Sequence, residues 1–205
     1  MCEYVSTFCI IFTTLILHNF ILYSFIRKLT VLYWVTNWSS IMGEELKQAL
    51  NLQPLITGGF FLELYRDTET LTKVQAGVEW LVEKRGTSTH IYYLLMGSDV
   101  EKFHRMRCDE GFSFYTGNTA VLIHCISPDG TLTTKKLDSK TFAFYVTVPK
   151  GSWFALELAD CSPNSYALMG CTVAPAFEYA ELEIADRQTL VKLFPQHLHL
   201  INKLT

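Results

Sequence analysis

The sequence predicts an all-β protein, folded as an antiparallel sandwich or barrel with a few short helices. Apolar runs rich in β-branched and aromatic residues follow one another along residues 60–173 at intervals of about 8–12 residues, with turn residues between them. Of the 205 residues, 49% are hydrophobic and 18% are charged, which indicates a buried core and excludes a disordered or collagen-like chain. The length fits one domain of about 150–200 residues with an appendage.

Residues 1–41 form a hydrophobic N-terminal extension that differs from the rest of the chain. Residues 5–26 carry no formal charge, and Arg27 and Lys28 follow them at once. About 18–20 apolar residues in a helix cross a bilayer core of about 30 Å, so the run predicts a single-pass anchor that leaves the following domain in the cytoplasm. Two alternatives stay open: Met42 is the native start, so that the extension is not part of the native protein, or the run packs as a soluble element.

Residues 42–205 are expected to form a single domain, because no repeat, low-complexity tract or linker divides them. A short helix is predicted over residues 43–50, since Ser40 can cap it and two glutamates lie in its first turn. Beyond the chain breaks at Pro54 and Gly58, strands are expected at residues 60–66, 90–96, 119–126, 131–136, 141–148, 152–158 and 165–173. A final helix over residues 186–194 begins at an aspartate cap and stops before Pro195.

Charge and cysteine content restrict the class of protein further. The formal net charge is −3, and no cluster of lysine and arginine provides the basic patch expected of a nucleic-acid-binding protein. The 6 cysteines include no CxxC pair and have no regular spacing. This pattern favours reduced thiols in a cytosolic compartment over a disulfide framework.

Residues 97–117 are expected to form a strand, a turn and a second strand, and they contain His104 and Glu110. With a glycine at each end, the spacing of these residues resembles the first metal-binding motif of the cupin superfamily. Met106 stands where that motif has its second histidine, and Phe154 stands where the second cupin motif has a histidine. A divalent iron, manganese or zinc ion in such a barrel needs three or four imidazole and carboxylate ligands. The two that remain predict a barrel without a metal or other cofactor.

Longer stretches resemble one branch of the superfamily, the small cupins that carry a domain of unknown function (the cupin 5 subfamily). These stretches are residues 58–66, 88–95, 103–105, 109–110, 148–155 and 170–177, in the order of that branch. The resemblance implies an RmlC-like jelly roll (a double-stranded β-helix), usually a homodimer, with a ligand cavity inside the barrel and no established reaction. The chain departs from the branch at residues 55–57, where His-Pro-Glu is usual, at Phe112 in place of tryptophan, and at Ala176 in place of glycine.

Seven residues are candidates for contact with a ligand in the cavity. They are Arg66, Tyr92, His104, Arg105, Glu110, Phe112 and Trp153. His104 can act as an acid or base near neutral pH, or it can be a structural histidine. Glu110 rather than Asp109 is expected to face inward, because neighbours in a strand point to opposite faces. Arg66 holds a phosphate or carboxylate in its fork or lies solvated at the rim, and the aromatic rings stack on a ligand or form plain core.

The sequence favours a protein that binds a small molecule in its barrel without a metal. One alternative is a metal-free sugar isomerase or epimerase, in which His104 takes a proton alpha to a carbonyl group and Tyr92 or Glu110 returns one. Another is a structural cupin that has lost its site. Whether the chain is an enzyme stays open. Its expected partners are the ligand, a second copy of the chain, and a membrane only if residues 5–26 are an anchor.

Overall fold

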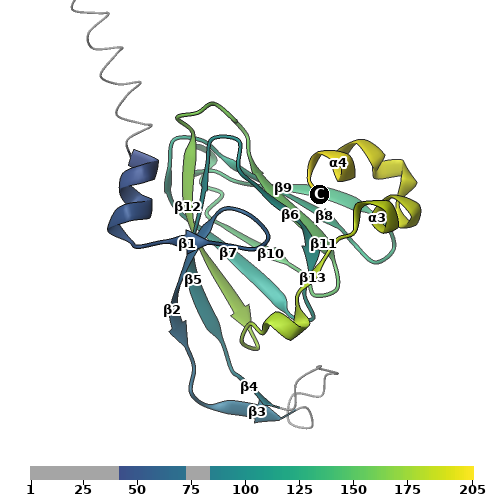
Figure 1. The fold of residues 1–205 in the computed structure, drawn as a ribbon, viewed down its shortest axis with the longest axis horizontal. Helices are drawn as coiled ribbons and strands as arrows, with labels where there is room; N and C mark the ends of the chain where they lie inside the picture. Colours follow the sequence, from purple (N-terminus) through teal and green to yellow (C-terminus); the bar gives the residue numbers. More distant parts are fainter. Residues whose placement is uncertain (1–41, 73–83) are drawn as a thin grey trace, which may run out of the picture. The chain divides into compact units, whose positions relative to one another are not determined.

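The structure, a computed structural model, describes residues 42–72 and 84–205 (Figure 1). The chain divides into two units, Met1–Ser39 and Ser40–Thr205. The predicted anchor at residues 5–26 and its alternatives therefore lie outside the described residues. Within the two described ranges, no helix is long and apolar enough to cross a membrane.

Two antiparallel sheets enclose the core of the described chain, which confirms the predicted all-β, jelly-roll class (Figure 1). The six-stranded sheet has the order β1 (Gln53–Pro54), β2 (Phe60–Arg66), β5 (Thr89–Met96), β12 (Tyr166–Ala174), β7 (Asp109–Gly117) and β10 (Tyr145–Val148). The five-stranded sheet has the order β13 (Glu183–Ile184), β6 (Val100–Arg105), β11 (Trp153–Leu158), β8 (Val121–Ile126) and β9 (Leu132–Leu137). Most neighbours in both orders are not consecutive in sequence, as in a jelly roll; β1–β2 and β8–β9 are the consecutive pairs.

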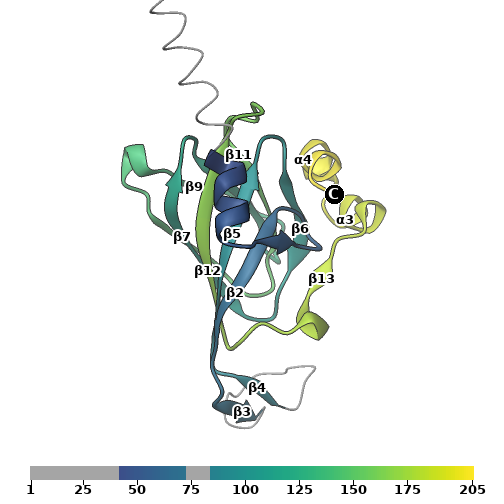
Figure 2. The ribbon, with the colours of Figure 1, turned by 60° about the vertical axis from the view of Figure 1, so that its left-hand side comes forward.

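The strands depart from the predicted ones in several places, and the two-residue strands β1 and β13 were not predicted. The hairpin of β3 (Thr70–Thr72) and β4 (Lys84–Gly86) extends β2 and β5 at their far ends and was not predicted (Figure 2). The predicted strand over residues 141–148 is wrong in its first half, because η1 (Ser139–Thr141) precedes β10. The Asp138 side chain accepts a hydrogen bond from the Lys140 N–H at 2.9 Å and so stabilises this turn instead of a strand.

Helices cover the outer faces of both sheets. Helix α3 (Arg187–Leu193) begins as predicted at Asp186, whose side chain accepts a hydrogen bond from the Thr189 N–H. The chain continues past Pro195 into η3 (Pro195–His197) and α4 (Leu198–Lys203), which were not predicted. Leu190 and Ile201 of these helices pack with Phe103 and Trp153 on the five-stranded sheet.

On the six-stranded sheet, residues 42–49 are helical, and Leu46 packs against the cluster of Leu52, Leu94 and Leu168. The inner faces of the two sheets form the largest apolar cluster, which includes Leu95, Phe112, Phe154 and Met169 among its buried side chains. Each sheet is therefore buried on both faces over much of its area. One part of the space between the sheets is not filled by this core.

Candidate functional site

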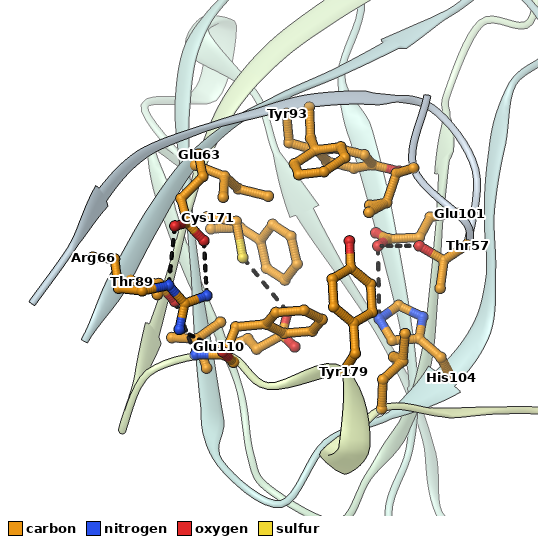
Figure 3. A pocket seen from close by; sticks show the side chains of 17 residues that line it. Thr57, Glu63, Arg66, Thr89, Tyr93, Glu101, His104, Glu110, Cys171 and Tyr179 are labelled. Carbon is orange, nitrogen blue, oxygen red and sulfur yellow. Dashed lines mark hydrogen bonds and ion pairs between the residues drawn. The ribbon is translucent and has the colours of Figure 1, made fainter. Parts of the chain in front are cut away.

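A cavity of about 240 Å³ lies between the sheets (Figure 3). Strands β2, β5, β6, β7 and β12 line it, together with the segment before β2 and the segment around η2 (Tyr179–Glu181). The lining residues are Leu55, Thr57, Phe61, Glu63, Arg66, Thr89, Ile91, Tyr93, Glu101, His104, Glu110, Phe112, Cys171, Val173, Phe177, Tyr179 and Leu182. Most of these side chains are apolar, and the ionisable ones gather around Glu101, Glu110 and Arg66.

A bulge in β6 brings Glu101 and His104 to the same cavity. In the pairing of β6 with β11, His104 lies opposite Phe154 and Glu101 opposite Leu156, so β6 has one residue more than its partner between the two pairs. In a regular strand, residues three apart face opposite sides, and the extra residue removes this difference. Phe103, between them, points outward into the cluster beneath the C-terminal helices.

His104 is held as a neutral imidazole. Its Nδ1 lies 2.7 Å from the Lys102 carbonyl oxygen, which assigns the ring proton to Nδ1 and leaves a lone pair on Nε2. Burial lowers the pKa of His104 to about 4. The Phe154 ring, at 4.1 Å between centroids, packs against the imidazole on the side where a cupin would have a further metal ligand.

Glu101 is a buried carboxyl group with one oxygen that lacks a hydrogen-bond partner among the described residues. The Thr57 hydroxyl donates a hydrogen bond to Oε1 at 3.3 Å, and His104 Nε2 lies 3.6 Å from the same oxygen. Oε2 has no hydrogen-bond partner. Burial, with the nearby Glu110 second, raises the pKa of Glu101 well above its usual value. Since burial lowers the pKa of the histidine, the contact joins two neutral groups and is not an ion pair.

The loop before β2 places Thr57 over Glu101. Gly58 has a φ of 122°, and a Cβ at this position would lie 2.0 Å from the Val100 carbonyl oxygen, so only glycine allows this approach to β6. The Lys102 N–H donates a hydrogen bond to the Thr57 carbonyl oxygen at 2.7 Å. The replacement of His-Pro-Glu in this loop thus leaves a hydroxyl group, not a carboxylate, at the cavity.

Glu110 and Cys171 form a second buried polar contact, between β7 and β12. The Cys171 thiol donates to Glu110 Oε2 across 3.5 Å, a weak hydrogen bond. Burial raises the pKa of Glu110 to about 7. Burial, and next the charge of Glu110, raises the pKa of Cys171 well above its usual value, which favours the protonated, unreactive thiol.

Arg66 lies at the rim of the cavity, where acidic side chains already occupy its fork. Its Nε and Nη2 bind the two carboxylate oxygens of Glu63 at 3.0 and 2.9 Å. Its Nη1 binds Glu178 Oε1 at 3.1 Å and the Phe177 carbonyl oxygen at 3.0 Å. Of the two alternatives left open for Arg66, a fork that holds a ligand anion and a solvated rim charge, the structure favours a rim position, where the protein's own carboxylates fill the fork.

The structure brings Arg66, His104, Glu110 and Phe112 together around the cavity. The other three candidates lie elsewhere. Tyr92 belongs to the outer face of the six-stranded sheet, where its ring meets that of Tyr115 edge-on at 5.9 Å. Arg105 lies over the ring of Trp153 at 4.7 Å, and Trp153 packs in the cluster under the C-terminal helices. Tyr93 is the β5 tyrosine that faces inward, so the prediction of Tyr92 is corrected by one residue.

The seven predicted ligand contacts do not include three polar members of the cavity lining, Thr57, Tyr93 and Glu101. With regular alternation along β6, the Glu101 side chain would point to the face opposite to that of His104. The bulge turns both side chains to the cavity. The run around Tyr93 is almost continuously apolar and so gives no signal for its inward face. The Tyr93 hydroxyl donates to the Gly58 carbonyl oxygen at 3.0 Å, and no local pattern in the sequence indicates that contact.

The donor set of the cavity does not fit the divalent metal that cupin barrels imply. Phe154 packs against the one histidine of the cavity, and Met106 is not among the lining residues. Over residues 42–72 and 84–205, no three histidine, cysteine, aspartate or glutamate side chains are grouped so that they could hold a metal ion. The pairs Glu101–His104 and Glu110–Cys171 each provide fewer ligands than such an ion requires.

The sequence pattern of the family described as "Cupin superfamily (DUF985)" matches residues 44–185. Among solved structures, protein SO0799 from Shewanella oneidensis is 28% identical, with a TM-score of 0.67, and the match covers 79% of this chain and 96% of that one. A hypothetical protein from Leishmania major is 23% identical with a TM-score of 0.69, covering 79% and 97% of the two chains, and this likeness shows the fold alone. A search of curated proteins gives no match.

Proposed function

Because this chain belongs to the cupin superfamily, in the family DUF985, we propose that it binds a small molecule inside its barrel. The observation that carries the proposal is Glu101 Oε2, a buried carboxyl oxygen in the cavity lining without a hydrogen-bond partner. A buried polar atom in this state costs about 1–3 kcal/mol of stability. A ligand group that bonds to this oxygen removes that cost.

The size of the cavity limits the ligand. At about 30 Å³ for each water molecule in the liquid, the volume of about 240 Å³ corresponds to a small metabolite. It lies below the range of about 300–1,000 Å³ usual for drug-sized ligands. A nucleotide sugar is too large for this space, so the substrate class of the sugar epimerases is not supported for the cavity itself.

The test is a thermal-shift screen of small metabolites, together with native mass spectrometry of the purified chain for a co-purified molecule. A ligand at 100 times its dissociation constant adds about 2.7 kcal/mol to the free energy of unfolding. Glu101→Leu should abolish the shift, because it removes the open oxygen. Glu45→Leu, on an exposed helical turn, is the matched control. If no compound raises the melting temperature, the chain fits the alternative of a structural cupin that has lost its site.

A second candidate, favoured by one observation, is a metal-free proton-transfer enzyme. Glu110, with a pKa of about 7, and Glu101, which burial keeps protonated, line the same cavity. A base with a pKa near the working pH is the effective one for removing a proton alpha to a carbonyl group. Glu110 is therefore better suited as the base than His104, whose pKa is about 4, and Glu101 can donate to the carbonyl oxygen.

Incorporation of solvent deuterium into small keto-acids and ketoses, followed by NMR, tests this candidate. Glu110→Gln should lower the exchange rate by about 10²–10⁴-fold, the usual contribution of a general base. Glu45→Gln should leave the rate unchanged. Exchange that survives in Glu110→Gln but is lost in His104→Gln would assign the base to the histidine instead. No exchange with any compound leaves binding without catalysis.

We also propose a homodimer, which the resemblance implies. Phe142, Phe144 and Tyr145, in and before β10, and Tyr115 on β7 have large exposed aromatic side chains, with exposures of 81%, 48%, 62% and 45%. An exposed aromatic patch marks an interaction surface, and a two-fold axis would bury the same patch on both copies. Light scattering should give the mass of two chains for the wild type and of one chain for Tyr145→Glu. A monomeric wild type would reject the dimer.

A further inference from the structure

The charges around the cavity restrict the chemistry of its ligand. This inference rests on the proposed function, the binding of a small molecule in the barrel. Among the lining residues that the structure describes, Arg66 is the one permanent cation, and Glu63 and Glu178 already neutralise it. Two further carboxyl groups, Glu101 and Glu110, lie inside. We propose that the cavity binds a small organic cation, a protonated amine on an apolar body, and rejects carboxylates and phosphates.

The hydrogen-bonding groups of the lining support this ligand class, because its two hydroxyl donors are bonded within the protein, whereas the Glu110 carboxylate and His104 Nε2 have acceptor capacity left. The Thr57 hydroxyl donates to Glu101, and the Tyr93 hydroxyl donates to the Gly58 carbonyl oxygen. Glu101 Oε2 has no partner. Glu110 receives only the weak thiol bond, and His104 Nε2 has a lone pair. An ammonium group has three donors and no acceptor, so it complements these sites.

The walls suit the same ligand. Phe61, Phe112 and Phe177 line the cavity with Tyr93 and Tyr179, and Figure 3 shows both tyrosines in the lining together with Glu101 and Glu110. Aromatic faces attract a cation through their quadrupole, and more strongly when water is excluded. An aromatic wall with carboxyl groups at its inner end therefore favours an amine over an alcohol of the same shape.

Binding is coupled to release of a proton. Burial raises the pKa of both interior carboxyl groups, that of Glu110 to about 7, so about half of the Glu110 carboxyl groups hold a proton at pH 7 in the absence of a cation. Glu110 loses its proton more readily near neutral pH. An amine that enters as ammonium pairs with the Glu110 carboxylate, and the proton of the carboxyl group goes to the buffer. At pH 7 this amounts to about half a proton for each amine bound.

Isothermal titration calorimetry of the full chain at pH 8 tests the proposal with three probes of nearly the same shape: 2-phenylethylamine, 2-phenylethanol and phenylacetate. The amine is expected to bind at least about tenfold more tightly than the alcohol, and phenylacetate more weakly than both. Repeating the amine titration at pH 7 in buffers of different ionisation enthalpy measures the released proton.

Variants separate this proposal from the function on which it rests. Glu110→Gln should reduce the affinity for the amine to that for the alcohol and leave the alcohol unchanged, whereas Glu45→Gln should change neither. A cooperative urea transition shows that Glu110→Gln is folded. Equal binding of amine and alcohol, or tighter binding of phenylacetate, overturns the cation proposal and leaves a small-molecule site. Failure of all three probes to bind at millimolar concentration overturns both.

Discussion

Two histidine–glutamate pairs lie on the five-stranded sheet, one on each face. His104 and Glu101 of β6 face the cavity, with 3.6 Å between Nε2 and Oε1. His124 of β8 and Glu157 of β11 lie on the outer face, with 3.2 Å between the same atoms. All four side chains are buried. The pairs therefore have the same residue types and a similar depth.

The difference lies in what completes each pair. On the outer face, the Thr134 hydroxyl lies 2.9 Å from His124 Nδ1, and Lys203 of α4 forms an ion pair with Glu157 Oε2. On the inner face, Glu101 Oε2 is buried and has, within the described ranges, neither a hydrogen-bond partner nor a cation beside it. The outer pair is completed by the protein and serves the docking of α4. The inner pair has no such partner at Glu101 Oε2 in the described chain, and this difference between two pairs of the same residue types supports the proposed ligand site.

The largest expected effect is on the pH dependence of stability. It concerns Glu110, which lines the same cavity as the inner pair. The pKa of Glu110, about 7, lies above the usual 4.5, so the folded chain holds a proton that the unfolded chain has lost. The contribution of this group is fully present below pH 4.5 and is lost as the pH rises through about 7. Glu110→Gln should therefore raise the free energy of unfolding by about 3 kcal/mol at pH 8. Urea unfolding at pH 5 and pH 8 measures this.

At pH 5 the variant and the wild type should differ little, because the carboxyl group is then protonated in the folded state. The same pH series on Glu45→Gln provides the control. If Glu110→Gln is no more stable than the wild type at pH 8, the cavity does not disfavour the ionised carboxylate and the proton coupling is wrong.

A smaller effect should separate the two glutamates of the compared pairs. Glu157→Gln removes the charge that Lys203 binds and weakens the bond to His124, so it should lower the free energy of unfolding by about 2 kcal/mol. Glu101→Gln should change it by less than about 1 kcal/mol, because the groups around Glu101 are the neutral side chains of Thr57, Tyr93 and His104. Urea unfolding at pH 7 measures both. A greater loss for Glu101→Gln would reverse the assignment of structural and functional pair.

Lys203 is expected to contribute less than the carboxylate that it binds. Its side chain is 49% exposed, and solvent screens its charge. Lys203→Met should therefore lower the free energy of unfolding by less than about 1 kcal/mol, and the loss should shrink as salt is added. A loss as large as that of Glu157→Gln would mean that the ion pair, not the histidine contact, carries the stability of the outer pair.

The smallest effect is spectroscopic. The Lys102 carbonyl oxygen fixes the proton of His104 on Nδ1. In the outer pair, Glu157 accepts from Nε2 of His124, and Nδ1 accepts from Thr134. Long-range proton–nitrogen NMR spectra should thus show opposite neutral tautomers, with His104 uncharged down to a pH near its pKa of about 4. The same tautomer in both rings would contradict the described hydrogen bonds.

Much of the fold could be predicted, because it depends on local rules. Alternation and turn residues locate most strands, and Asp186 and Pro195 correctly bound the core of α3. The strand predicted at residues 141–148 was wrong in its first half, since the cap at Asp138 outweighs the β propensity of the following aromatic residues. Helix α4 was missed, because its short sequence is stabilised mainly by packing on the sheet.

The sequence by itself determined the strand-rich class, the family, the inward direction of His104 and Glu110, and the loss of two metal-ligand positions at Met106 and Phe154. These follow from residue identity and spacing along one stretch of chain. Only the tertiary structure decided the rest of the site. The β6 bulge turns Glu101 inward. Glu178, 112 residues away in sequence, binds the Arg66 guanidinium group. Strand register and long-range ion pairs depend on how distant segments meet, which no local spacing contains.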